Sequence, residues 1–486
     1  MPLVLGGSSA VIPAYDIDNS CRWNGDIDAS YLSRTSPNSA PTLETKGTFS
    51  IWFKRANIGR NDYIFGTASA SGPQSDIWID TNDNFKIIVY DGGTKCALTT
   101  TRTFRDNSAW CHVVFSYDST PATPSASSVQ LWFNGVKETS FSLETYPSQN
   151  DAMEAFQQNH PQNIGTDYSL GTKVFDGYLA ECMGVDGQAL LNTDFGVFDT
   201  SSPTMWKAID ISEINVGTLG WHLDFKDSAN LGNDVSAVAT DFTATNFAAA
   251  DQATDTPTNN FATLNQTAVT AGIGNNLTFS EGNLKIVNTG GGLWEPAIAT
   301  MAAIGGKWYA EFKCTALGGA QSYGIMDPSQ YNDDMTLDNP AQLSRAYGMS
   351  YSSGYATNHN NGTAWGETFT TGDIISVAMD LDNMKCYQAK NGTWVDSGDP
   401  TSGATGTGTH VYFGGASNSA RAAGVDWYAF FASIHNSSTG EINFGGCPAF
   451  AITSSNADAN GYGNFEYAVP AGYYAMCSKN LAEFGG

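Results

Sequence analysis

The chain has 486 residues, of which 14% are charged and 12% aromatic, with 51 glycines. Few charges combined with many aromatic and glycine residues indicate short strands joined by turns, and they argue against long helices and against disorder. The formal net charge of −26 opposes binding to nucleic acid, and no apolar run reaches the ~18 residues that a membrane-spanning helix needs.

The N-terminal half opens with an apolar segment, residues 1–14, which lies outside the strand pattern and lacks the basic stretch of a signal peptide. We expect this segment to pack as an anchor. Strands rich in aromatic and β-branched residues are then predicted at 18–24, 47–55, 110–118, 127–141, 175–185 and 221–225. Within 127–141, Leu131 and Phe133 follow a two-residue period, and Asn134-Gly135 predicts a hairpin turn.

This order of strands resembles the laminin-G-like, concanavalin-like jelly roll, a β-sandwich, over residues 15–236. The resemblance implies that 221–225 is the closing strand. Domains of this kind often hold calcium at a loop rim, and residues 16–20, 24–28 and 80–84 cluster the oxygen ligands that calcium prefers. None of the three segments matches an EF-hand loop, so calcium binding and solvated turns are both open interpretations.

The middle of the chain, residues 237–258, is small and polar with little to bury, so we predict a linker there. Residues 259–446 then form a second β domain, with strands at 306–314, 323–326, 372–394, 428–435 and 441–445. The remaining stretch, 447–486, is glycine-rich with scattered aromatic residues. We expect it to be a tail that packs on its own domain or on a neighbour.

The segment 372–394 has the clearest pattern in the chain. Ile375 and Val377 alternate with small or polar residues, which is the period of a strand with one face in a core. A break at Asp382-Asn383 and a type I′ turn at Asn391-Gly392 predict a three-stranded meander. The sequence GDIISVAMDLDN followed by an NG turn resembles the signature of the SPRY domain, a β-sandwich that binds partners.

Together the two halves predict an all-β chain of two tandem antiparallel β-sandwiches. The first, over residues 15–236, is jelly-roll and concanavalin-like, and the second, over residues 259–446, is SPRY-like. Sequences of this kind place their binding residues on loops that a rigid sandwich positions.

Motifs for catalysis and for structural metals are not found in the sequence. There is no GxSxG elbow, no HExxH helix and no Walker loop, and the eight cysteines are scattered without a CxxC pair. We therefore expect a protein that is not an enzyme, without a cofactor other than calcium, and with reduced, buried cysteines. His112 and His222 fall inside strands, where packed histidines are expected.

The loop-rich region 323–366 is the candidate binding surface, because tyrosine and tryptophan among asparagine, serine and glycine form rigid anchors with adaptable hydrogen bonds. The predicted ligand-binding residues are Tyr331, Tyr351, Tyr355, His359 and Trp365. The alternative is that Tyr347, Tyr351 and Tyr355 line a strand of the sandwich.

Tandem sandwiches on an acidic chain without a leader resemble the fibre, spike or decoration proteins of tailed bacteriophages. The resemblance implies a virion protein that is made in the host cytoplasm and assembles with other virion proteins, as a homo-oligomer such as a trimer. It favours a tail fibre or head-attached appendage that adheres to host-surface glycans, with no nucleic-acid partner and no membrane insertion. The alternatives are a decoration or vertex protein of the capsid, a polysaccharide depolymerase, and a cellular SPRY adaptor.

Overall fold

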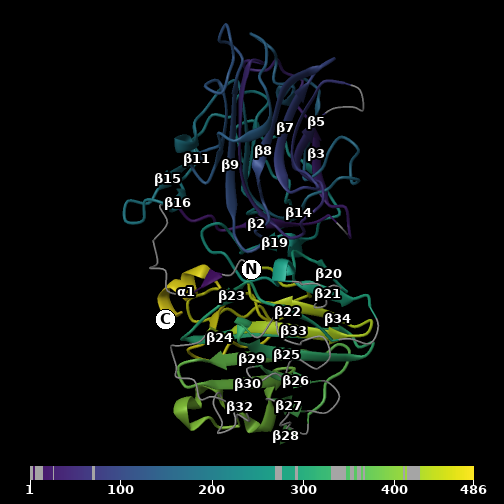
Figure 1. Cartoon of the computed structure of the whole chain (residues 1–486), viewed down its shortest axis with the longest axis vertical. Coiled ribbons are helices and arrows are strands. Elements are labelled where there is room, and N and C mark those ends of the chain that lie inside the picture. The colour runs from purple at the N-terminus through teal and green to yellow at the C-terminus, as the bar shows by residue number, and fades with distance from the viewer. Residues whose placement is uncertain are drawn as a thin grey trace. The chain divides into compact units, whose positions relative to one another are not determined.

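The computed structural model describes residues 4–5, 15–25, 27–67, 72–268, 276–290, 294–329, 346–350, 355–357, 363–364, 367–408, 411–412 and 427–485 (Figure 1). The chain divides into two compact units. We call Val11–Thr258 the first sandwich, and Asn259–Gly486 together with Met1–Ala10 the second sandwich. The chain is all-β, as predicted, and its described part contains one α-helix, α1 (Ser478–Phe484).

Two antiparallel sheets form the first sandwich. Sheet one has the order β11-β10-β9-β4-β14-β2-β19, with β17 paired to β14, and sheet two has the order β12-β8-β7-β6-β5-β13-β3-β18. The strands of sheet one are β2 (Ser20–Asn24), β4 (Lys46–Arg55), β9 (Cys111–Asp118), β10 (Val129–Phe133), β11 (Val136–Lys137), β14 (Asp176–Asp186), β17 (Trp221–Leu223) and β19 (Gln252–Ala253). Those of sheet two are β3 (Tyr31–Thr35), β5 (Asp62–Thr67), β6 (Gln74–Ile79), β7 (Asn84–Tyr90), β8 (Thr94–Thr103), β12 (Phe141–Thr145), β13 (Pro161–Ile164) and β18 (Thr243–Thr245).

The core of the first sandwich lies between these sheets, where Trp23, Phe49 and Trp221 are part of one buried apolar cluster. A separate ribbon of β15 (Gly196–Phe198) and β16 (Trp206–Ala208) completes the strands of this unit. All strands predicted in the N-terminal half are present, so the sandwich and its approximate strand positions are confirmed.

Both strand histidines of the first sandwich are packed, as predicted. His112 Nδ1 accepts a hydrogen bond from Trp206 Nε1 at 3.0 Å, and its Nε2 lies 2.9 Å from Ser50 Oγ. Burial lowers the pKa of His112 to about 3, so the ring is neutral at physiological pH. His222 Nε2 lies 2.7 Å from Glu181 Oε2. These side chains hold strands together.

The hairpin between β10 and β11 turns at Asn134 and Gly135, whose φ angles are 48° and 75°, as a type I′ turn requires. A Cβ added at Gly135 would lie 2.1 Å from Trp206 Cε3, whereas a Cβ added at Gly92, with φ of 60°, would have no atom within 4 Å.

We expect Gly92→Ala to lower the free energy of unfolding by about 1–2 kcal/mol from backbone strain alone. Gly135→Ala should cost about 1–3 kcal/mol more, from steric overlap. Denaturant unfolding of the two variants measures the difference, and equal losses would contradict the overlap.

The segment 237–258 is not a linker, so that prediction is wrong. Its residues form β18, which pairs with β3, and β19, which pairs with β2. Asp255 is 1% exposed and binds Lys54 Nζ at 2.8 Å, while its other oxygen accepts from Trp110 Nε1 at 3.0 Å. Asp251 likewise pairs with Arg22 at 3.0 Å. Small residues with two well-placed carboxylates therefore complete the first sandwich, because they neutralise cations that β2 and β4 bury.

Two sheets also form the second sandwich. The first has the order β20-β21-β34-β24-β29-β30-β31, with β32 on β30 and β35 on β24, and the second has the order β22-β33-β25-β26-β27-β28. The former contains β20 (Leu277–Ser280), β21 (Lys285–Asn288), β24 (Lys307–Ala316), β29 (Ile374–Asp380), β30 (Lys385–Lys390), β31 (Thr393–Trp394), β32 (Val411–Tyr412), β34 (Thr439–Asn443) and β35 (Tyr474–Ala475). The latter contains β22 (Trp294–Ile298), β25 (Ala320–Met326), β26 (Ala346–Ser350), β27 (Tyr355–Thr357), β28 (Thr363–Ala364) and β33 (Ala429–His435).

The remaining short elements are β1 (Val4–Leu5), which runs parallel to β23 (Met301–Ala302), and several 3-10 helices. The 3-10 helices are η1 (Glu154–Phe156), η2 (Asn192–Asp194), η3 (Ala249–Asp251), η4 (Gln266–Ala268), η7 (Val395–Ser397) and η8 (Pro400–Thr405). Apart from β1, the predicted anchor segment 1–14 lies outside the described residues.

The predicted meander is confirmed as β29, β30 and β31, and its last turn has φ angles of 49° at Asn391 and 78° at Gly392. Aromatic rings from the two sheets meet in the core, with Phe312 of β24 5.1 Å from Tyr323 of β25 between ring centroids. The stretch 447–486 packs on its own sandwich through β35 and α1. The buried carboxylate of Glu311 accepts the backbone N–H groups of residues 466 and 467 in this stretch.

Candidate functional site

Most of the predicted ligand-binding residues lie outside the described residues, namely Tyr331, Tyr351, His359 and Trp365. Tyr355 begins β27, a strand whose side chains are not described. The role of these five residues in binding therefore stays a prediction. Tyr347 is 2% exposed in β26, and its ring lies 6.4 Å from that of Tyr428. For Tyr347 the strand interpretation is the correct one.

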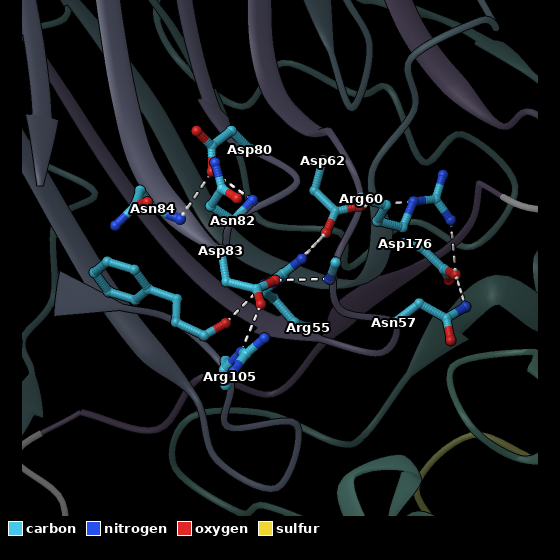
Figure 2. A network of polar contacts seen from close by, with 12 residues as sticks. Arg55, Asn57, Arg60, Asp62, Asp80, Asn82, Asp83, Asn84, Arg105 and Asp176 are labelled. Atoms are coloured by element: carbon cyan, nitrogen blue, oxygen red, sulfur yellow. Dashed lines mark hydrogen bonds and ion pairs between the residues drawn. The ribbon is translucent and has the colours of Figure 1, made fainter. Parts of the chain in front are cut away.

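The acidic segment 80–84, one of the calcium candidates, is held by protein cations and backbone N–H groups (Figure 2). Asp80 accepts from the N–H groups of Asn82 and Asn84 at 2.9 and 3.1 Å, and it pairs with Lys86 at 2.8 Å. In the same turn, Asp83 binds Arg55 at 2.8 Å and Arg105 at 2.7 Å.

Asp83 shows why these carboxylates are not solvated turn residues. Burial alone would raise its pKa, but the N–H of Gly59 and the guanidinium groups of Arg105 and Arg55 together lower the pKa below its ordinary value. Arg55 also binds Asp62 at 2.6 Å, so one buried guanidinium joins two buried carboxylates. Asp83 therefore belongs to a largely buried ion-pair network of the first sandwich.

No group of three or more His, Cys, Asp or Glu side chains is placed to hold a metal ion anywhere in the part of the chain that the structure describes. Of the other calcium candidates, Asp18 has a side chain that is 66% exposed and lies 4.0 Å from Lys226. Asp80 and Asp83 are thus held by cations of the protein, and Asp18 is exposed near Lys226.

A different cluster lies on the outer face of sheet two. In β6, Ile77 and Ile79 belong to the core, so Asp76 and Trp78 point to the opposite face. Trp78 is paired with Tyr63 of β5, and their rings are parallel within 7° at a centroid distance of 5.4 Å. We call this cluster, with the neighbouring residues Asp167, Tyr168 and Lys173, the aromatic–acid patch.

The aromatic–acid patch combines exposed rings with charged groups. Lys173 Nζ binds Asp167 at 3.0 Å and lies 5.3 Å from the ring centroid of Tyr63 and 6.0 Å from that of Tyr168. Trp78 is partly exposed and Tyr168 is 37% exposed, whereas Asp167 is fully buried. Rings with accessible edges or faces beside hydrogen-bonding groups are the usual components of a sugar-binding surface.

Asp76 is the most perturbed group of the patch. Burial, opposed by the N–H of Thr67 and by Lys173 and reinforced by Asp167, raises the pKa of Asp76 to about 7. Burial and the charge of Asp76 also raise the pKa of Tyr63 to about 12. A strongly shifted carboxyl beside the partly exposed ring of Trp78 marks a candidate functional site.

Sequence reasoning missed this patch, although one signal was present. The strand QSDIWI at 74–79 carries an aromatic and an acidic residue on the face that its isoleucines leave to solvent. A tryptophan there is unusual for a purely solvated face. Tyr63 and Lys173 are brought to the same place only by the pairing of β5 with β6 and by the loop before β14, which no local pattern reveals.

Residues 24–187 match the family described as the concanavalin A-like lectin/glucanases superfamily, which supports the concanavalin-like prediction for that stretch. No curated protein is similar enough to match the chain. No helix in the described residues is long and apolar enough to cross a membrane.

Three solved structures are similar to parts of the chain. The SPRY domain of human HERC1 is 14% identical, with a TM-score of 0.25, over 36% of this chain and 94% of that one. A heptameric SAP-like pentraxin from Limulus polyphemus is 14% identical, with a TM-score of 0.27, over 36% and 80%. Stonustoxin is 15% identical, with a TM-score of 0.25, over 37% and 27%. Similarities of this size do not indicate a shared function.

Proposed function

We propose that the chain is a bacteriophage virion protein, a tail fibre or head-attached appendage, that adheres to host-surface glycans without cleaving them. The observation that carries the adhesion is the aromatic–acid patch on the outer face of sheet two. Trp78 and Tyr168 offer apolar ring surface to the C–H groups of a sugar, and Asp76 and Lys173 offer hydrogen bonds to its hydroxyls.

The virion location rests on the resemblance of tandem sandwiches on an acidic chain to phage appendage proteins. Cryo-electron microscopy of purified particles tests it, because the position and copy number of the chain separate the alternatives. A tail or vertex position supports an appendage, whereas a regular lattice over the shell supports a decoration protein. Absence from particles contradicts both.

For the adhesion itself, we expect Trp78→Ala to weaken glycan binding by the purified chain at least tenfold, which corresponds to about 1.4 kcal/mol. Leu143→Ala is the matched control, because Leu143 is 51% exposed on β12 of the same sheet and lies outside the patch. Binding is measured on an array of bacterial surface glycans, with the melting temperature of each variant as a check on folding. New reducing ends during incubation would instead indicate a depolymerase.

The loops of the second sandwich provide the competing location for the glycan site. If they carry the adhesion, the triple substitution of Tyr351, Tyr355 and Trp365 by alanine abolishes adsorption to host cells while Trp78→Ala leaves it unchanged. That result would overturn the assignment to the aromatic–acid patch and keep the adhesion function.

A further inference from the structure

We propose that the aromatic–acid patch selects sugars that carry a free ammonium group, such as unacetylated hexosamines, over neutral and acidic sugars. This inference rests on the proposed glycan adhesion, and it names the chemical class of the glycan.

The cations of the patch are already neutralised. Lys173 pairs with the buried carboxylate of Asp167 at 3.0 Å, and Lys86, 5.9 Å from the ring centroid of Trp78, pairs with Asp80 at 2.8 Å. A sugar carboxylate or sulfate would therefore have to displace a protein carboxylate from its lysine. The net charge of −26 on the chain further opposes an anionic ligand.

Asp76 differs from these groups, because it has no ion-pair partner among the described residues and the charge of Lys173, which is bound to Asp167, offsets its charge only in part. Its Oδ1 accepts the N–H of Thr67 at 3.2 Å, and its Oδ2 has no hydrogen-bond partner among the residues that the structure describes. The residue is 5% exposed, so water solvates its charge poorly. A ligand ammonium beside Oδ2 supplies the missing ion-pair partner.

The ionisation of Asp76 makes this selectivity depend on pH. The titratable groups that face Asp76 are Tyr63 from β5 and Asp167 and Lys173 from the loop before β14. With a pKa of about 7 for Asp76, about one tenth of the chains carry the charge at pH 6 and about nine tenths at pH 8. Because a cation prefers the ionised form, its affinity rises by up to about tenfold between these pH values.

The test is calorimetric titration of the full chain with three oligosaccharides of equal length. One is a glucosamine oligomer made permanently cationic by N-trimethylation, one is its N-acetylated counterpart, and one contains glucuronate. We expect the cationic sugar to bind at least tenfold more tightly than the other two at pH 8, and to lose up to about tenfold in affinity at pH 6. The permanent charge ensures that only the protein titrates.

Asp76→Asn is the diagnostic variant, since it keeps the shape of the side chain and removes the buried charge. It should lose both the preference for the cationic sugar and the pH dependence. Glu144→Gln is the matched control, because it removes an equal charge from β12 of the same sheet, outside the patch. Retained preference in Asp76→Asn, or equal loss in Glu144→Gln, overturns the proposal.

The outcomes also separate this inference from the proposed function. If all three sugars bind equally and binding still requires Trp78, the selectivity is wrong and the adhesion stands. If the glucuronate sugar binds most tightly, the selectivity is likewise overturned. If no sugar binds at either pH, both the selectivity and the adhesion at this patch are contradicted.

Discussion

Arg55→Ala is expected to destabilise the first sandwich by about 3–5 kcal/mol, the typical cost of removing one partner from a buried ion pair. The side chains of Arg55, Asp62 and Asp83 are all 0% exposed, and Arg55 binds both carboxylates (Figure 2). Its Nη1 also donates to the carbonyl oxygen of Phe104. The variant therefore leaves two carboxylates and a carbonyl buried with fewer donors, and much of the marginal stability of a domain is lost.

Arg105 provides a matched control because it binds the same Asp83 at 2.7 Å while its own side chain is 64% exposed. Arg105→Ala should cost less than about 1 kcal/mol, as solvent-exposed pairs do. The measurement is hydrogen exchange or pulse proteolysis of peptides from residues 11–258, which reports on this unit separately. Equal losses in the two variants would contradict the assignment of the network to Arg55.

The pH dependence of this effect has a definite sign. The pKa of Asp83 is lowered from 3.8 on folding, so its stabilising contribution is complete above that value and is lost as the pH falls through the folded-state pKa. The difference in stability between the wild type and Arg55→Ala should accordingly narrow as the pH drops below 3.8. A difference that stays constant to lower pH would show that packing, rather than charge, dominates.

Glu311→Ala is expected to destabilise the second sandwich by about 3–5 kcal/mol, because several donors, some of them buried, lose their acceptor at once. Glu311 is 0% exposed, and its Oε1 accepts from the Tyr309 hydroxyl at 3.0 Å and from the Tyr467 N–H at 2.8 Å. Its Oε2 accepts from Asn443 Nδ2 at 3.1 Å and from the Glu466 N–H at 2.9 Å. One carboxylate thus attaches residues 447–486 to the centre of a sheet.

The readout for Glu311→Ala is site-resolved hydrogen exchange at the amides of residues 466 and 467, which should become much faster, together with the melting temperature. Glu466→Ala is the control in the same segment, because the Glu466 carboxylate is partly exposed and, among the described residues, its hydrogen bonds come from Thr453 and Ser454. It should cost less than about 1 kcal/mol. Unchanged exchange at residue 467 in Glu311→Ala would contradict the anchoring role.

The strands that the sequence does predict have local signals, whereas β5 to β8 of sheet two were not predicted. Asn391-Gly392 and Asn134-Gly135 require positive φ angles that few other dipeptides adopt, and the alternation around Ile375 needs only its neighbours. The role of residues 237–258 is not local. Asp255 stabilises the fold by pairing with Lys54, which lies 201 positions earlier in the sequence. Composition alone does not reveal this contact, so it suggested a linker.

The candidate site was less predictable for the same reason. Trp78 carried a usable signal on β6, but Tyr63, Asp167 and Lys173 come from other elements and meet it only in the folded sheet. The pKa of Asp76 depends on burial, which strand periodicity does not predict for the outer face. In the tyrosine-rich region that the sequence favoured as a binding surface, Tyr347 is a core residue.

The pairing of β18 with β3 and of β19 with β2 has a consequence for biosynthesis. In each sheet of the first sandwich, one of the two edge strands is synthesised last. These strands are β19 in sheet one and β18 in sheet two, and their partners, β2 and β3, lie among the first 35 residues. In a nascent chain, β2 and β3 therefore stay unpaired on one side until most of the unit has been translated. Pairing strands that are so far apart in sequence is also slow. During that interval β2 and β3 can accept the late strands of a neighbouring nascent chain, so we expect strand exchange between copies to be a route of misassembly for this unit.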